Sequence, residues 1–281
     1  MPELPEVETA MRGLEARLIG RRFDSVIQRR ADLRFPLPEN LPERLTGCRI
    51  LSFKRRAKYI LIELDNAHRL LLHLGMSGRL LFDGETAGPH EHLTFGFDDG
   101  STLRYVDPRR FGMLDLVAET ELDQHPRLRA LGVEPLDRRF DGKALKAILK
   151  GRISPIKTAI MNQKLIVGVG NIYACESLFK AEVSPFKEAS SLRPAECRRL
   201  ANEIRNVLGA AIKAGGSSLR DYVQTDGELG YFQHQFEVYG RADLPCPACG
   251  QPIKSVLLAN RTTFFCQRCQ GSPSPRGRRD R

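Results

Sequence analysis

The chain has 281 residues, which is enough for about two domains with cores of their own. Its 44 Lys and Arg outnumber 34 Asp and Glu, a formal net charge of +10 that favours a polyanionic partner, nucleic acid before an anionic membrane surface. The chain opens without the basic start and apolar run of a signal peptide, and its longest nearly apolar run, 70–74, is far too short to span a bilayer. We therefore expect an intracellular protein whose seven Cys are thiols or metal ligands rather than disulfides.

The first half of the chain predicts one helix followed by short strands. Apolar residues recur at helical spacing over 3–20, and Gly20 follows as a stop. From about residue 23 to 117 the pattern changes to short alternating or apolar runs, which is typical of a β-sandwich or barrel. The strands that we expect lie at 23–28, 49–53, 59–64, 93–97 and 103–106.

The second half of the chain changes to helical patterns. The polar segment 119–135 holds two Pro and one Gly, and we expect it to be a hinge. Residues 217–235 mix Gly, Asp, Gln and aromatic residues, which indicates a loop. Helices are expected over 144–149, from Asn171 onward and over 194–214.

Four cysteines near the end of the chain have the spacing C-x2-C-x16-C-x2-C, namely Cys246, Cys249, Cys266 and Cys269. Two thiolate pairs at this spacing can close a tetrahedral site for one zinc ion, with strands expected at 255–258 and 262–265. Four thiolates leave no open position for water, so we expect a structural zinc rather than a catalytic one. Such a module would hold Arg261 rigidly near a hairpin tip, where its guanidinium can bind phosphate. Two redox pairs are the alternative.

Short motifs run through almost the whole chain in one order. The chain opens on Pro2-Glu3-Leu4-Pro5-Glu6-Val7-Glu8-Thr9. The others are Arg55-Arg56-Ala57-Lys58-Tyr59, His73-Leu74-Gly75-Met76-Ser77-Gly78, Asp107-Pro108-Arg109-Arg110-Phe111-Gly112, Val167-Gly168-Val169-Gly170-Asn171-Ile172-Tyr173, Thr225-Asp226-Gly227 and Val238-Tyr239-Gly240-Arg241. With the cysteine module, this set resembles the formamidopyrimidine-DNA glycosylase family.

Pattern and resemblance together imply an α+β fold. We expect an N-terminal β-sandwich with a leading helix, a helical helix–two-turns–helix DNA-binding domain and a C-terminal β-hairpin zinc finger. The resemblance also implies a monomer in the bacterial cytoplasm that meets duplex DNA containing oxidised purines or abasic sites in the nucleoid. The expected boundaries are 1–118 for the sandwich, 119–135 for the hinge, 136–235 for the helical domain, 236–270 for the zinc finger and 271–281 for a disordered basic tail.

The resemblance implies an enzyme that removes an oxidised purine and then cleaves the strand. A terminal amine has a reference pKa of about 8, so the amine of Pro2, once Met1 is lost, can attack the sugar C1′ and form a Schiff base. Glu3 would be the acid for opening the sugar ring. By resemblance, Lys58 assists base removal and β-elimination, and Arg261 grips phosphate and is linked to δ-elimination.

These residues also have ordinary explanations. Pro2 is a common signal for trimming of Met1, Glu3 suits the positive end of a helix dipole, and Lys58 could be a solvated charge in a basic turn.

A glycosylase must flip its target nucleotide out of the stack, so a protein group should fill the space left behind. Met76, Arg109 and Phe111 resemble the family's residues for this task, with Arg109 donating to the orphaned base, usually cytosine. Met76 and Phe111 could equally be core residues by composition, although their Gly neighbours favour loop tips.

Phosphate contacts are expected from His90, Arg110, Arg152, Lys157 and Asn171. His92 is the alternative to His90, and Arg152 stands where the family often has Lys. Asn171 follows a Gly-Val-Gly turn and is expected to cap a helix that begins at Ile172.

Two other functions remain open. An endonuclease VIII-type enzyme shares the Pro2-Glu3 start but prefers oxidised pyrimidines, and its opening usually reads Pro-Glu-Gly-Pro where this chain has Leu4. A non-catalytic zinc-containing nucleic-acid-binding protein fits the charge and the cysteines, but it gives no reason for the set of Pro2, Glu3 and Lys58.

Overall fold

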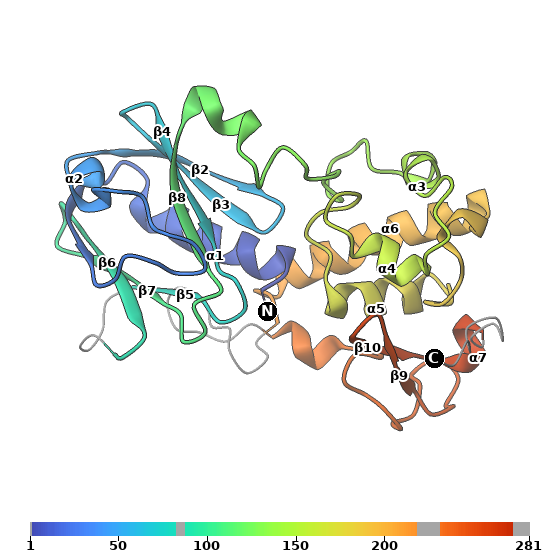
Figure 1. Ribbon diagram of the computed structural model, residues 1–281. Helices are drawn as coiled ribbons and strands as arrows, with labels where there is room; N and C mark the ends of the chain where they lie inside the picture. The colour runs from blue at the N-terminus through green and yellow to red at the C-terminus, as the bar shows by residue number, and fades with distance from the viewer. Residues whose placement is uncertain (1, 83–87, 218–230, 272–281) are drawn as a thin grey trace. The chain divides into compact units, whose positions relative to one another are not determined.

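The computed structural model describes residues 2–82, 88–217 and 231–271 (Figure 1). Within these ranges, no helix is both long enough and apolar enough to cross a membrane.

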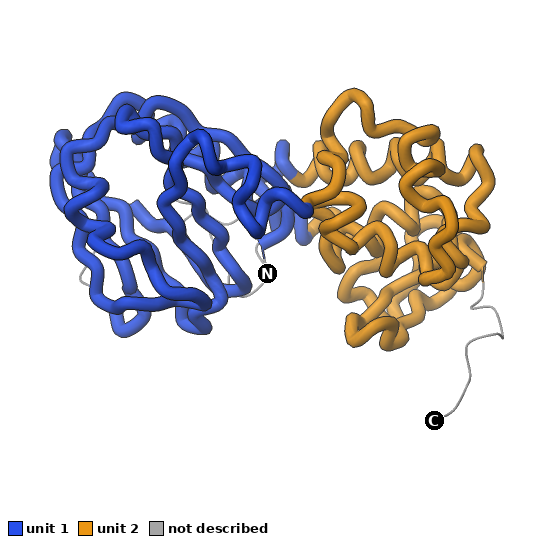
Figure 2. The backbone as a smooth tube through the Cα atoms, turned by 45° about the horizontal axis from the view of Figure 1, so that its top comes forward, with its two compact units in different colours: residues 1–130, 212–233 blue, residues 131–211, 234–281 orange. Residues whose placement is uncertain are grey.

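The chain divides into two compact units, which Figure 2 colours separately. Unit 1 comprises residues 1–130 and 212–233, and unit 2 comprises residues 131–211 and 234–281. Each unit has buried apolar clusters of its own, so each is built around a separate core.

Unit 1 is a β-sandwich that begins with a helix (Figure 1). One sheet has the strand order β1-β6-β7-β5 and the other β2-β3-β4-β8, and every strand pair is antiparallel. The helices are α1 (Leu4–Leu18), α2 (Leu41–Leu45) and the 3-10 helix η1 (Glu119–Gln124). The strands are β1 (Phe23–Gln28), β2 (Ile50–Arg56), β3 (Tyr59–Leu64), β4 (His68–His73), β5 (Arg79–Phe82), β6 (Glu91–Phe97), β7 (Thr102–Val106) and β8 (Met113–Ala118).

The second sheet of unit 1 is covered on both faces. Alternate residues of a strand point to opposite faces, and in β4 Leu70 and Leu72 join the main core while Leu71 joins a second apolar cluster. Phe35 and Tyr59 pack against this second cluster. Because both of its faces are apolar, β4 lacks the polar-apolar alternation of a half-exposed strand.

The expected fold class is confirmed. Strands were expected at the positions of β1 and β3, and the expected helix over 3–20 is α1, with Glu3 as its N-cap. The strands β4, β5 and β8 were not predicted, because β4 reads as a continuous apolar run and β5 has only four residues. The loop expected at 217–235 falls mostly outside the described residues.

The described part of unit 2 carries one long helix, α6, several shorter helices and a β-hairpin (Figure 1). The strands β9 (Lys254–Leu258) and β10 (Arg261–Phe265) pair with each other, and β10 lies against α5. The α-helices are α3 (Gly142–Ile148), α4 (Ile156–Ile160), α5 (Asn171–Lys180), α6 (Pro194–Lys213) and α7 (Gln267–Gln270), and the 3-10 helices are η2 (Ala189–Ser191) and η3 (Phe232–Gln235). The last two residues of α6 and the first two of η3 are assigned to unit 1.

The break between the units at residues 130 and 131 falls inside the expected hinge. The motif at 225–227 and the basic tail after Gly271 lie outside the described residues.

Candidate active site and nucleic-acid contacts

The start of helix α1 is held in place by a buried carboxylate. Pro2 and Glu3 are both buried, and the backbone N–H of Glu3 donates to Glu6 Oε2 at 2.8 Å. Glu6 Oε1 accepts two more hydrogen bonds, from the N–H of Ser217 at 2.8 Å and from its hydroxyl at 2.9 Å. Since Glu6 is only 2 % exposed, water cannot replace these donors. The residue that follows Pro2 is therefore fixed by a contact with a segment more than 200 residues further along the chain.

Lys58 lies in the two-residue turn that joins β2 to β3. Arg56 pairs with Tyr59 across this turn, and Ala57 has the positive φ of 56° that such a tight turn requires. Lys58 is only 7 % exposed, which does not fit a solvated surface charge. The turn is tied to α1, because Arg55 donates to Glu8 at 2.7 Å and to the carbonyl of Ala57 at 2.9 Å. Helix α1 thus contributes Pro2 and Glu3 at its start and anchors the turn that carries Lys58.

His73 lies beside this turn at the end of β4. Its ring packs on Tyr59 with the centroids 4.8 Å apart, and its Nδ1 accepts the N–H of Gly75 at 3.0 Å. Burial, reinforced by the positive charges of Lys58, Arg34 and Arg127, lowers the pKa of His73 to about 4. The ring is therefore neutral at pH 7 and free to act as a hydrogen-bond acceptor for the loop that carries Met76.

Met76 and Phe111 sit on two loops of unit 1 that touch. Phe111 is 41 % exposed, so it is not a core residue, and Met76 is partly buried. The guanidinium of Arg109 stacks over the Phe111 ring at 4.8 Å. Arg110 is exposed and has a positive φ of 54°.

The structure distinguishes the two candidate histidines. His90 is exposed, whereas His92 is 5 % exposed and its Nε2 donates to the carbonyl of Asp107 at 2.8 Å. The ring of His92 is thus engaged inside the protein.

Lys157 is a buried residue of unit 2 with protein partners. It is 1 % exposed, and its Nζ donates to Asn171 Oδ1 at 2.6 Å and to Thr263 Oγ1 at 2.7 Å. A longer bond of 3.3 Å reaches the carbonyl of Thr262. The ammonium therefore joins the start of α5 to strand β10.

Asn171 has a different place from the one expected. Helix α5 begins at Asn171 itself and its N-cap is Gly170, so the prediction that Asn171 caps a helix beginning at Ile172 is wrong. Its side chain is occupied instead by Lys157 and by the carbonyl of Thr262, which accepts from Nδ2 at 2.9 Å.

Arg152 and Arg261 are both exposed in unit 2. Arg261 is the first residue of β10 and follows a turn in which Ala259 and Asn260 both have positive φ, the type I′ geometry of a tight hairpin. The hairpin places Arg261 at its tip, as the spacing predicts.

The four cysteines converge on one point in unit 2. Their Sγ atoms all lie within 4.8 Å of one another, and two of the Sγ–Sγ distances are 3.9 Å (Cys246 to Cys269) and 3.5 Å (Cys249 to Cys266). Sulfurs at tetrahedral corners of a zinc ion, with bonds of about 2.3 Å, are about 3.8 Å apart. The donor set and its spacing therefore fit one structural zinc ion, which is the expected cofactor.

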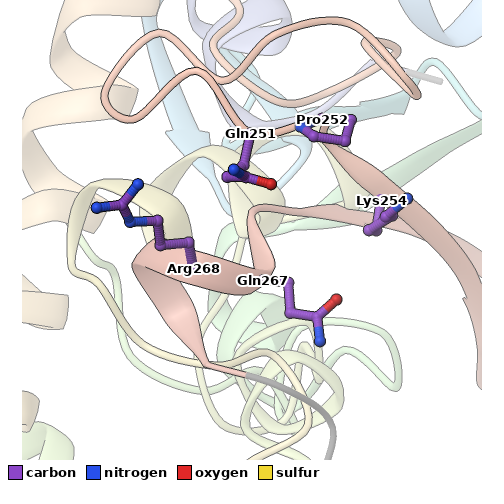
Figure 3. Close-up of a pocket in the computed structure, with 5 residues that line it drawn as sticks. All are labelled: Gln251, Pro252, Lys254, Gln267 and Arg268. Carbon is purple, nitrogen blue, oxygen red and sulfur yellow. The ribbon is translucent and has the colours of Figure 1, made fainter.

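A hollow of ≈ 230 Å³ lies in the same module (Figure 3). Neither a carboxylate nor a thiol is among its lining side chains, so it offers amide groups and positive charges but no carboxylate for acid–base chemistry. It is lined by Gln251, Pro252, Lys254, Gln267 and Arg268.

Several buried anchors were not predicted from sequence. Besides Glu6, the carboxylate of Glu176 accepts the backbone N–H groups of Glu237, Val238 and Tyr239 at 2.8–3.0 Å. Burial raises the pKa of Glu176, against the opposing effect of these hydrogen bonds. Glu6 belongs to the opening motif, but Glu176 lies outside the motifs, and motif membership does not reveal a contact partner.

Comparisons with known proteins match three successive segments of the chain. Family models match in chain order: formamidopyrimidine-DNA glycosylase N-terminal domain over 1–114, formamidopyrimidine-DNA glycosylase H2TH domain over 131–223, and zinc finger found in FPG and IleRS over 243–271. The formamidopyrimidine-DNA glycosylase of Dinoroseobacter shibae is 50 % identical over 283 residues, covering 96 % of this chain and 100 % of the relative.

Two solved structures are similar over the same span. The MutM (FPG) protein from Thermus thermophilus has a TM-score of 0.87 at 41 % identity, covering 96 % of this chain and 99 % of that one. Lactococcus lactis Fpg (MutM) in complex with N7-benzyl-Fapy-dG containing DNA has a TM-score of 0.89 at 34 % identity, covering 96 % and 100 %. The chain belongs to the formamidopyrimidine-DNA glycosylase family.

Proposed function

We propose that this chain excises oxidised purines, 8-oxoguanine and formamidopyrimidines, from duplex DNA and then cleaves the strand by β,δ-elimination, with the Pro2 amine as nucleophile. One observation carries the proposal beyond family membership. The start of α1, with Pro2 and Glu3, is pinned by Glu6, and the same helix anchors the Lys58 turn through the Glu8–Arg55 pair. The proposed nucleophile and the turn that carries Lys58 are thus both tied to one helix.

The amine of Pro2 attacks the sugar C1′ as the bond to the base breaks, and the electron pair of that bond leaves with the base. The attacking nitrogen loses its N–H proton to water, and Glu3 donates a proton to the ring oxygen. The bond between C1′ and the ring oxygen then breaks with its electron pair on the oxygen, and the lone pair of the Pro2 nitrogen forms an iminium with C1′. The iminium acidifies the C2′ proton. Lys58 assists departure of the base and loss of this proton, which expels the 3′ phosphate.

Arg261 binds phosphate at the damaged nucleotide and assists δ-elimination of the 5′ phosphate. Its place at the tip of the β9–β10 hairpin supports this role. Zinc, when bound by Cys246, Cys249, Cys266 and Cys269, supplies the rigidity of this small module rather than chemistry.

Recognition of the lesion requires a flipped nucleotide and a filled gap. The exposed Phe111 and the partly buried Met76 support insertion into the stack, and Arg109 donates to the orphaned base. Phosphates are contacted by Arg110, Arg152 and the exposed His90. We prefer His90 to His92 because the ring of His92 is already hydrogen-bonded to the carbonyl of Asp107 inside the protein.

Lys157 acts on DNA indirectly in this proposal. Its ammonium donates to three acceptors inside unit 2 and so holds Asn171 and strand β10, and Asn171 contacts phosphate through the second N–H of its side-chain amide. The protein acts as a monomer in the bacterial cytoplasm, held to the nucleoid through DNA.

A panel of duplexes that each carry one lesion tests the substrate class. Under single-turnover conditions, 8-oxoguanine and a formamidopyrimidine opposite cytosine should be excised much faster than oxidised pyrimidines. Faster excision of oxidised pyrimidines would identify an endonuclease VIII-type enzyme instead. Binding to every duplex without cleavage of any, by protein with a confirmed Pro2 terminus, would identify a non-catalytic binder.

A further inference from the structure

Asp107 is a fully buried carboxylate in unit 1 that accepts hydrogen bonds from two loops. Its Oδ1 accepts the hydroxyl of Ser77 at 2.6 Å, and Ser77 is 4 % exposed. Its Oδ2 accepts the backbone N–H of Gly112 at 2.8 Å and lies 3.5 Å from the hydroxyl of Tyr105. Hydrogen bonds to a buried carboxylate are stronger than neutral ones, so these contacts fix both loops firmly.

The backbone of Asp107 reaches a third segment. Its N–H donates to the carbonyl of His90 at 3.0 Å, and its carbonyl accepts Nε2 of His92 at 2.8 Å. The segment that carries the exposed His90 is therefore tied to the same residue.

Further contacts join the two loops. The backbone N–H of Arg109 donates to Ser77 Oγ at 3.2 Å. A Cβ atom on Gly75 would lie 2.3 Å from the carbonyl carbon of Phe111, and one on Gly112 would lie 1.6 Å from the hydroxyl oxygen of Tyr105. At Gly75 the backbones of the two loops thus approach so closely that a side chain is excluded, and at Gly112 the side chain of Tyr105 takes up the space.

We infer that Ser77 and Asp107 form a clasp that holds Met76 and Arg109 in one fixed relative position, which makes Ser77 a positioning residue for selectivity toward the base opposite the lesion. The hydroxyl of Ser77 donates to Asp107 and accepts from Arg109, so it ties the loop of Met76 to two residues of the loop that carries Arg109. The inference rests on the proposed function, because it concerns how Met76 fills the gap and how Arg109 meets the orphaned base.

The physical reason is preorganisation. If Met76 and Arg109 are already aligned, the loops that carry them need no ordering when DNA binds. Loops that move separately must be ordered on binding, and this ordering weakens the affinity. Misplacement of a donor by about 1 Å is enough to lower a rate constant about a hundredfold. Loss of the clasp should therefore weaken the preference for cytosine more than it weakens the chemistry at the sugar.

The test compares Ser77→Ala, Ser77→Cys and a matched control in the full-length, zinc-loaded protein with a confirmed Pro2 terminus. The control is Ser101→Ala, since Ser101 also donates to a carboxylate at 2.6 Å, that of Asp99, but in the β6–β7 turn. One measurement is the single-turnover rate constant for excision of 8-oxoguanine opposite cytosine and opposite adenine. The other is strand cleavage at an abasic site in single-stranded DNA, which has no opposite base and needs no gap to be filled.

In Ser77→Ala the cytosine-to-adenine ratio should fall about tenfold, as expected for loss of a hydrogen bond to a buried charged group, while cleavage of the single strand stays within about twofold of the unchanged chain. The cytosine-to-adenine ratio of Ser77→Cys should lie between the ratios of the unchanged chain and of Ser77→Ala, because a thiol is a weak hydrogen-bond donor. Ser101→Ala should keep the full ratio.

Three results would overturn the inference. They are an unchanged ratio in folded Ser77→Ala, a parallel loss of single-strand cleavage, and a Cys variant no better than the Ala variant. If Ser77→Ala does not fold by circular dichroism, the comparison of Ser77→Cys with the unchanged chain decides the question by the same two measurements. Failure of the unchanged chain to excise 8-oxoguanine at all would instead refute the proposed function before any variant is compared.

Discussion

Replacement of Lys157 by Met separates the two roles that this residue can have. The substitution keeps the length and apolar stem of the side chain but removes the ammonium. Two short hydrogen bonds, to Asn171 and Thr263, and one long one are lost from a site that is 1 % exposed. At about 1.5 kcal/mol for each short bond to a charged donor, the variant should be less stable by about 3 kcal/mol.

The stability assay is urea unfolding of the zinc-loaded protein followed by far-UV circular dichroism, because the chain has no Trp. The binding assay is the dependence of DNA affinity on salt. A direct phosphate contact by Lys157 would contribute about 0.9 to the slope of log affinity against log salt. We expect Lys157→Met to bind more weakly with the slope unchanged, because Asn171 is neutral and its contact releases no counterion.

The exposed Arg152 provides the matched control. Arg152→Met should lower the salt slope by about 0.9 and leave the unfolding transition where it is. If Lys157→Met gives that pattern instead, with full stability and a reduced slope, Lys157 contacts phosphate directly and the reasoning from its burial is refuted.

Three further predictions test other anchors. Glu6→Gln cannot accept all the donors that meet Glu6, so it should destabilise the protein by about 2 kcal/mol and slow Schiff-base formation at Pro2; full trapping and stability would show that the anchor is dispensable. Removal of zinc by a chelator should unfold the cysteine module and weaken DNA binding, which zinc addition should restore; unchanged binding by protein shown to be metal-free would contradict this. The pKa of His73 is about 4 in the folded chain against an ordinary 6.5, so unfolding takes up a proton between these values and stability falls as pH drops from 6.5 to 4, by at most about 3 kcal/mol. His73→Asn, whose Oδ1 can accept the N–H of Gly75, should lose this part of the acid sensitivity; an identical pH profile would refute the assignment.

The sequence predicted elements well where one physical signal dominated. Flanking turns with an alternating or short apolar run gave β1 and β3, and thiolate spacing gave the zinc module. It failed at β4, where Leu70, Leu71 and Leu72 are buried on two different faces and no alternation remains. Periodicity reports exposure to water, so a strand covered on both sides does not show it.

In the candidate site, the sequence did not show which residues contact one another. Residue types and motif order pointed to Lys157 as a phosphate ligand, but its acceptors on β10 lie 105 and 106 residues away along the chain. Ser77 and Asp107 appeared within motifs without any sign that they touch. A local sequence pattern identifies side chains that could bind DNA or take part in catalysis. Only the folded structure shows which of these side chains are hydrogen-bonded to one another.

The most direct test of the central claim is borohydride trapping on a labelled duplex with one 8-oxoguanine opposite cytosine. Reduction of the iminium should leave a covalent complex, and peptide mapping should locate the DNA on the amine of Pro2. A chain that retains Met1, verified by mass, should give no such complex. A complex on another residue, or equal trapping with Met1 in place, would contradict the claim that the Pro2 amine is the nucleophile.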